Sequence, residues 1–185
     1  VLIKKIKFTG NKIFKDRKLR NIILSEEGKP WKFISNKKYL DQQRINLDTQ
    51  LLKNFYENNG YYQVRIDNAS ASLLDTNNFE LIFNIDAGDK FFFNDIKLEI
   101  PPDYDVNNFS SITDLFKDLK NKSYSYDKIE KILDEIDLIA LSEQYEFINA
   151  TVEESIVDTN KINFVFTINE TEKFYVEKIN ILGNN

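Results

Sequence analysis

The side chains of this 185-residue chain that are paired as a catalytic site would need are carboxylates, and the absence of His, Cys and Met removes imidazole and thiolate chemistry. Asp134 and Asp137 share one face of a predicted helix, and Glu153 and Glu154 are adjacent in a predicted strand. A pair of carboxylates is what a glycosidase-like site needs. No imidazole is present for general acid–base catalysis, and no pocket-forming apolar segment accompanies these residues. We therefore predict that the chain is not an enzyme.

A second acidic cluster has the spacing that opens a calcium-binding loop. Asp103, Asp105 and Asn107 take alternate positions at its start, and Asp114 stands where the last ligand would be. Asn108 occupies a position where such loops need glycine, and a bidentate Glu is the usual last ligand. The alternative is a solvated acidic helix start, where negative charge favours the helix dipole. We predict no metal site and no cofactor.

The charge pattern argues against a nucleic-acid partner. The net charge is -5 and the sequence pI is about 5.0. Lys and Arg are interspersed with Asp and Glu along the chain, whereas a surface for phosphates needs clustered cations. The composition, with 42% hydrophobic and 14% aromatic residues, is sufficient to bury globular cores.

An aromatic loop is a candidate partner site. Trp31 and Phe33 follow Gly28 and Pro30 in a predicted loop. If exposed, the two rings could anchor a partner or a neighbouring domain. The alternative is that Trp31 folds back over the helices, since large aromatic side chains are mostly buried in proteins.

The elements that would position these residues are repeated along the chain. Residues 62–98 align without a gap on residues 145–181, an offset of 83 residues (158 minus 75). The identical pairs include Tyr62 with Tyr145 and Asp75 with Asp158. A fixed period indicates one supersecondary unit used twice. We predict one domain over 1–88, a second over 89–171, and the first strand of a further domain over 172–185.

Each unit is predicted to be a β-α-α-β-β fold of the α+β class. Alternating apolar residues predict strands, helical spacing predicts helices, and turn residues separate them. In the longest helix of the first unit we expect Leu40, Leu47, Leu51 and Phe55 on the buried face. Each unit would be a three-stranded mixed sheet with two helices covering one face. The predicted elements are 3–9, 16–24, 37–58, 61–74 and 78–86, followed by 91–100, 106–119, 126–142, 145–157 and 161–169.

The strand before each hairpin turn loses its alternation at the same place in both units. A one-residue slip is what a β-bulge produces, and bulges concentrate on edge strands. An open edge can pair with an extended partner through backbone hydrogen bonds, although a bulge can equally serve to discourage aggregation. We predict partner binding at these edges, with candidate residues Val64, Arg65, Ile66, Ala69, Phe147, Ala150 and Val152.

The joints that follow the two hairpins are only a few residues long, too short for free tethering. Gly88 gives the backbone more freedom than Thr171 at the corresponding position, so we expect the first joint to be the softer one. The candidate hinge residues are Gly88, Lys90, Thr171 and Lys173.

Two segments resemble the POTRA domain family: LLKNFYENNGYY over residues 51–62 and FNIDAGDKF over residues 83–91. The resemblance covers the whole chain. The chain is similar to the third and fourth POTRA domains, plus the first strand of the fifth, of outer-membrane β-barrel assembly factors from alphaproteobacteria. The second unit departs from the pattern, with Glu143 and Gln144 replacing Gly60 and Tyr61 and with Thr171 replacing Gly88.

The resemblance implies a periplasmic scaffold at the bacterial outer membrane that has no catalytic step. Its expected partners are unfolded outer-membrane protein clients, accessory lipoproteins of the assembly complex, and a C-terminal β-barrel of the same protein. Clients would bind by β-augmentation. Three alternatives remain open at this point: a POTRA array of a two-partner secretion protein, one of an organellar import barrel, and a structural array without clients.

Overall fold

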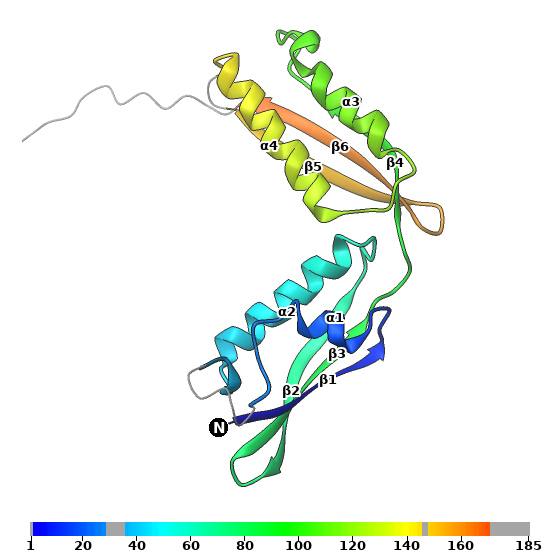
Figure 1. Ribbon diagram of the computed structural model, residues 1–185. Helices are drawn as coiled ribbons and strands as arrows, with labels where there is room; N and C mark the ends of the chain where they lie inside the picture. The colour runs from blue at the N-terminus through cyan, green and yellow to red at the C-terminus, as the bar shows by residue number, and fades with distance from the viewer. Residues whose placement is uncertain (1, 29–35, 146–147, 171–185) are drawn as a thin grey trace, which may run out of the picture.

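The computed structural model describes residues 2–28, 36–145 and 148–170. The described residues form two units that follow each other along the chain (Figure 1). The first unit contains β1 (Leu2–Asn11), α1 (Asp16–Arg20), η1 (Asn36–Lys38), α2 (Gln42–Glu57), β2 (Arg65–Asp75) and β3 (Asn78–Asp86). The second contains β4 (Phe92–Glu99), η2 (Val106–Phe109), α3 (Ser110–Leu119), α4 (Tyr126–Ser142), β5 (Ile148–Val157) and β6 (Lys161–Glu170).

Each unit has a three-stranded sheet in which the last strand lies in the centre. The strand orders are β1-β3-β2 and β4-β6-β5. In the first sheet the central strand β3 runs parallel to β1 and antiparallel to β2. In the second sheet β6 runs parallel to β4 and antiparallel to β5, so both sheets are mixed. Two α-helices cover one face of each sheet (Figure 1). The predicted fold class is confirmed.

The cores lie between the central strands and the helices. In β3, Leu81, Phe83 and Ile85 are fully buried, as the alternation predicts. In β6 the same pattern buries Ile162, Phe164, Phe166 and Ile168, and α3 and α4 add apolar side chains at helical spacing. Strong periodicity therefore places β3 and α4 within the bounds that the sequence predicts.

The buried face of α2 differs from the prediction. Leu47 has 47% of its surface exposed, whereas Ile45, Leu52 and Tyr56 are buried. Asp48 lies on the same buried face, with no exposed surface. Its carboxylate accepts hydrogen bonds from the backbone N–H groups of Leu24, at 2.6 Å, and Ser25, at 3.2 Å. The need to satisfy these donors, of which that of Ser25 is buried, fixes the rotation of the helix and overrides the leucine stripe.

The predicted bulge occurs in the first unit only. The β2–β3 register shifts between Asp67 and Ser70, so that Ile66 and Ala69 both pack against the core. The β5–β6 ladder is continuous from Ile148 to Val157, which corrects the prediction for the second unit. Ile148 packs against the core in phase with the residues that follow, so alternation continues without an inserted residue.

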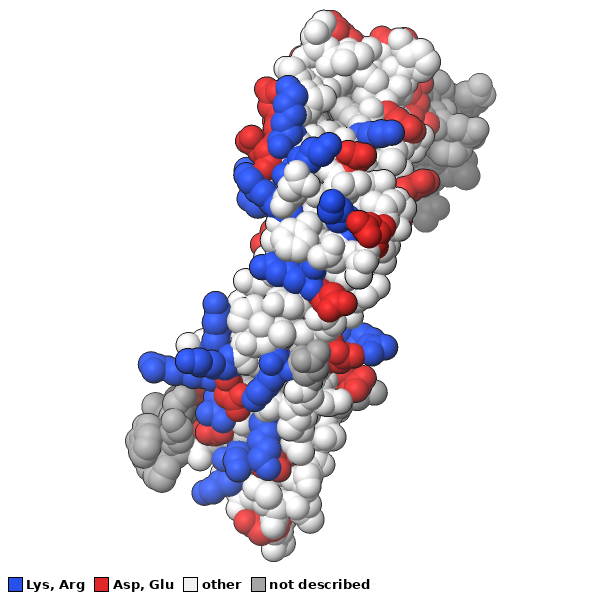
Figure 2. Space-filling model, turned by 90° about the vertical axis from the view of Figure 1, so that its right-hand side faces the viewer, with Lys and Arg blue, Asp and Glu red and all other residues white. Residues whose placement is uncertain are grey.

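Basic and acidic side chains are interspersed over the face shown in Figure 2. None of the helices in the described ranges is long and apolar enough to cross a membrane.

Candidate binding edges and the joint between the units

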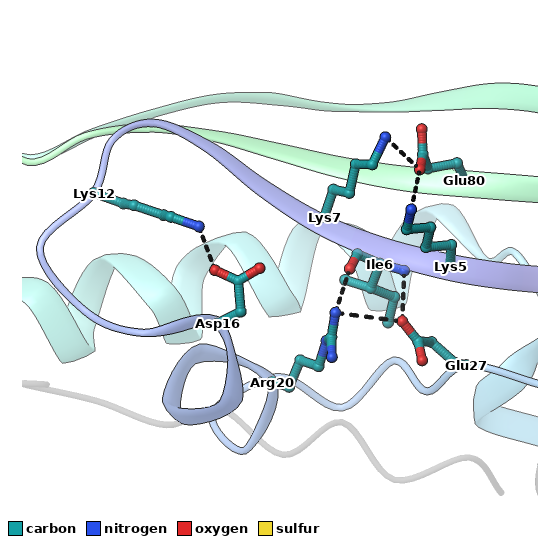
Figure 3. Close-up of polar contacts among 8 residues, drawn as sticks. All are labelled: Lys5, Ile6, Lys7, Lys12, Asp16, Arg20, Glu27 and Glu80. Atoms are coloured by element: carbon teal, nitrogen blue, oxygen red, sulfur yellow. Dashed lines mark hydrogen bonds and ion pairs between the residues drawn. The ribbon is translucent and has the colours of Figure 1, made fainter.

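The outer edge of β1 is covered by the chain that follows α1 (Figure 3). Gly28 N–H donates to the Ile3 carbonyl at 2.8 Å, and Glu27 Oε1 accepts from Ile6 N–H at 3.0 Å. Arg20 donates to the Ile6 carbonyl at 3.0 Å and pairs with Glu27 at 3.6 Å. Ile3 and Ile6 are buried on the helix-covered face. In this strand, residues that face the helices therefore direct their backbone groups outward.

β2 lies at the opposite edge of the same sheet and is open. Its described backbone pairing is with β3 alone. Arg65 and Asp67 lie opposite Asp86 and Asn84 on the face away from the helices, and direct their backbone groups toward β3. Because backbone direction alternates with side-chain face, Ile66 and Ala69 direct their N–H and C=O groups to the outer edge. Ala71 and Leu73 continue this row beyond the bulge.

Val64 and Arg65 were both predicted as residues of the open edge, and each lies in a different environment. Val64 precedes β2 and is buried at 5% exposure, so it is a core residue and not part of the open edge, which corrects the prediction. The guanidinium of Arg65 lies 2.5 Å from the Asp86 carboxylate on the adjacent strand, and this hydrogen bond raises the pKa of Arg65.

In the second unit, β5 is also an outer strand, paired with β6. Ala150 and Val152 pack partly against the core, so the alternation rule directs their backbone groups outward. Several predicted residues lie outside the described ranges: Trp31, Phe33, Phe147, Thr171 and Lys173.

Hydrogen bonds connect the two units at the joint between them. Phe91 N–H donates to the Gly60 carbonyl at 2.8 Å. The Asn58 side-chain oxygen accepts from Asp127 N–H at 2.8 Å and from the Ser125 hydroxyl at 3.2 Å. Ser125 occupies the N-cap of α4 but makes no side-chain cap bond of its own. Asn58 of the first unit therefore caps a helix of the second.

Tyr62 extends from the first unit into the core of the second. Its ring centroid lies 5.6 Å from that of Phe91 and 5.0 Å from that of Tyr124. Its hydroxyl donates to Glu154 at 2.5 Å. Burial, followed by the hydrogen bond to the Glu154 carboxylate, raises the pKa of Tyr62 to about 12. Sequence reasoning found Tyr62 only as a repeated position and did not predict that it joins the units.

The two glycines near the joint are not equivalent. Gly60 has φ of 101°, and an added Cβ would lie 2.4 Å from the Ser123 hydroxyl of the second unit. Gly88 has φ of 65°, and an added Cβ would have 3.7 Å to its nearest neighbour. An added Gly60 Cβ would also lie 2.9 Å from the Cγ and Cε atoms of the Lys90 side chain. Gly60 is thus required by close packing between units, a role that the sequence analysis missed.

The acidic clusters take structural positions. Asp105 caps η2 by accepting from Asn107 N–H at 2.9 Å, as in the acidic helix start. Glu154 accepts from Tyr62 across the joint. Within the described ranges, no group of three or more acidic side chains is arranged to hold a metal ion.

The first unit matches a known family model, and the fold of both units matches solved structures. The POTRA family model, described as a surface antigen variable number repeat, matches residues 1–88. The crystal structure of Haemophilus influenzae BamA POTRA3-5 superposes with a TM-score of 0.70 and 16% identity, over 92% of this chain and 66% of that one. The two units have the fold of tandem POTRA domains, and residues 1–88 match the model of that family. A second similar structure is BamA of Haemophilus ducreyi lacking POTRA domains 1-3, with a TM-score of 0.65, 12% identity, and coverage of 92% and 30%.

The curated relatives of this chain share one name. The chain is 27% identical over 184 residues to the outer membrane protein assembly factor BamA of Neisseria meningitidis serogroup B, covering 97% of this chain. It is 26% identical over 198 residues to BamA of Buchnera aphidicola subsp. Acyrthosiphon pisum, covering 100% of this chain. The chain spans 23% and 30% of the lengths of these two relatives.

Proposed function

We propose that this chain is a periplasmic scaffold module of an outer-membrane protein assembly factor, and that it holds unfolded outer-membrane protein segments along its open sheet edges. The name shared by the curated relatives supports the assembly role. In this proposal the units correspond to the third and fourth POTRA domains of the longer protein. Accessory lipoproteins and a C-terminal β-barrel of the same protein are its further partners, and no catalytic step is involved.

The observation that carries this proposal is the open edge of β2. Ile66, Ala69 and Ala71 are expected to direct their backbone donors and acceptors to solvent, where an extended client can pair with them. Backbone pairing is independent of side-chain identity, which suits a scaffold that receives many client sequences. The exposed side chains of Leu73, at 60%, and Leu74, at 49%, provide apolar contacts near the hairpin turn.

Proline substitution at Ala71 tests the edge directly. Ala71→Pro removes an outward N–H and leaves the inner ladder with β3 in place, because proline is tolerated on edge strands. We expect crosslinking of an unfolded outer-membrane protein segment to a photoreactive residue at Ser70 to fall by about fivefold, the loss that one hydrogen bond produces. Ala71→Ser keeps the N–H and is the matched control.

Equal crosslinking in both variants would refute the role of this edge. Ala150→Pro and Ala150→Ser provide the same comparison on β5, where the alternation rule also predicts an outward N–H.

A further inference from the structure

The outer edge of β4 is covered only at its beginning. Phe93 N–H donates to the Lys122 carbonyl, Asn121 N–H donates to the Phe93 carbonyl, and Tyr124 N–H donates to the Phe91 carbonyl, each at 2.9 Å. Phe92 and Ser123 form an antiparallel bridge. The loop between α3 and α4 thus adds to the first residues of β4 as a short strand.

Beyond this loop the edge of β4 is open. The register with β6 shifts between Phe93 and Ile96, which places Ile96 and Leu98 on the helix-covered side. By the rule seen in β1, these two residues direct their N–H and C=O groups outward. Within the described ranges, no residue hydrogen-bonds to those outer groups.

A groove of about 430 Å³ runs beside this open segment, between β4 and α3. Ile96, Leu98 and Phe116 supply apolar walls, with Ile96 and Leu98 only partly buried. Such a groove offers an extended chain both backbone partners and contacts for every second side chain.

The charged residues at the groove favour an acidic occupant. The lining residues include Lys97 and Glu99, which alternate with Ile96 and Leu98 and project from the opposite face of β4, so Lys117 and Lys120 face the groove beside Asp95. Lys120 pairs with Asp95 at 3.1 Å and Lys117 pairs with Asp114 at 2.8 Å, both at exposed positions. Exposed ion pairs are weak and exchange partners readily. An incoming carboxylate therefore has cations available to it.

We propose that β4 and α3 form a second strand-addition groove, whose occupant is an extended segment of a non-native polypeptide with apolar side chains at alternate positions and acidic residues between them. The strand would continue the antiparallel ladder that residues 121–124 begin. This inference rests on the proposed function for the class of occupant, but it assigns a different surface, on the first strand of the second unit.

The experiment uses the full 185-residue chain and a synthetic peptide of alternating Val and Glu with blocked termini. Titration followed by amide NMR should shift the signals of Ile96 and Leu98 beyond those of the remaining β4 residues. Leu98→Pro removes one outward N–H, and should weaken binding at this groove about fivefold relative to Leu98→Ala, which keeps it. A peptide with Lys replacing Glu should bind more weakly, and Lys117→Glu should reverse that order.

Equal binding by the Leu98→Pro and Leu98→Ala chains would overturn the proposal that this groove binds the peptide. Absence of shifts at Ile96 and Leu98 would overturn it as well. The same titration reports on Ala71 of β2 separately. Binding at β2 without binding at β4 refutes this inference alone, whereas absence of binding at both edges also contradicts the proposed function.

Discussion

The two units share a topology but differ in what covers their first strand. In the first unit α1 has 5 residues, and the chain after it returns along β1 and hydrogen-bonds to the edge. In the second unit α3 has 10 residues, and the short loop to α4 reaches only the first residues of β4. A longer helix therefore leaves less chain for covering the edge. One repeat can thus expose different edges, depending on the segment between its helices.

The largest effect is expected where the cover of β1 is anchored. Asp48→Ala leaves the buried N–H of Ser25 and the partly buried N–H of Leu24 without an acceptor, which should cost about 3 kcal/mol of unfolding free energy. Asp134→Ala, on the exposed face of α4, should change stability by less than about 0.5 kcal/mol. Urea unfolding monitored by Trp fluorescence and circular dichroism measures both. Similar losses would show that Asp48 has no special role.

The joint should be next in size. Gly60→Ala introduces a clash with Ser123 and a strained φ, and we expect a loss of about 2 kcal/mol together with weaker coupling between the units. Gly88→Ala introduces the positive-φ strain without the clash and should cost about 1 kcal/mol. NMR relaxation would show separate tumbling of the units in the Gly60 variant only. Independent tumbling in the wild-type chain would contradict the packed joint.

Uncovering β1 should make the first unit resemble the second. Glu27→Ala removes the acceptor for Ile6 N–H, with an expected loss of about 1 kcal/mol. The alternating Val and Glu peptide should then shift the Ile6 amide, which it leaves unchanged in the wild type. Glu27→Gln, which keeps a side-chain oxygen as the acceptor, serves as the control. Failure of the peptide to reach Ile6 in the Glu27→Ala variant would argue that covering does not determine edge availability.

The smallest effect concerns pH at the joint. Burial raises the pKa of Glu57, Lys53 opposes this shift, and the Glu154 carboxylate adds to it. A raised carboxyl pKa means that the folded state binds more protons than the unfolded state, so stability falls as pH rises from the ordinary Glu range through the raised value. Glu57→Gln should flatten the fall of Tm over this window. An unchanged pH profile in Glu57→Gln would contradict the assignment.

Much of the fold follows from periodicity, but the contacts between elements do not. The alternation in β3 and the helical spacing in α4 predict both elements because each pattern has one consistent burial solution. The face of α2 was wrong because Asp48 is buried for the sake of backbone donors distant in sequence. Such pairing over 24 residues has no local signature.

The repeat itself conceals the joint. Tyr62 and Tyr145 are identical positions, yet Tyr62 inserts into the second unit while Tyr145 stacks on Tyr104 of its own unit, at 4.0 Å between ring centroids. Sequence alone gives both the same environment. The candidate edge of β2 could be predicted, because a bulge breaks a visible alternation. The open segment of β4 could not, because it depends on where a loop ends.

Amide hydrogen exchange in the full native chain tests the central claim, that covering decides which sheet edges are free. The Ile6 N–H bonds to Glu27, whereas those of Ala71 and Leu98 are expected to face solvent. We predict that Ile6 exchanges at least about 100-fold more slowly than Ala71 and Leu98, and that added strand-forming peptide slows the latter two. Equal exchange at the three amides, or no slowing on peptide addition, would contradict the account.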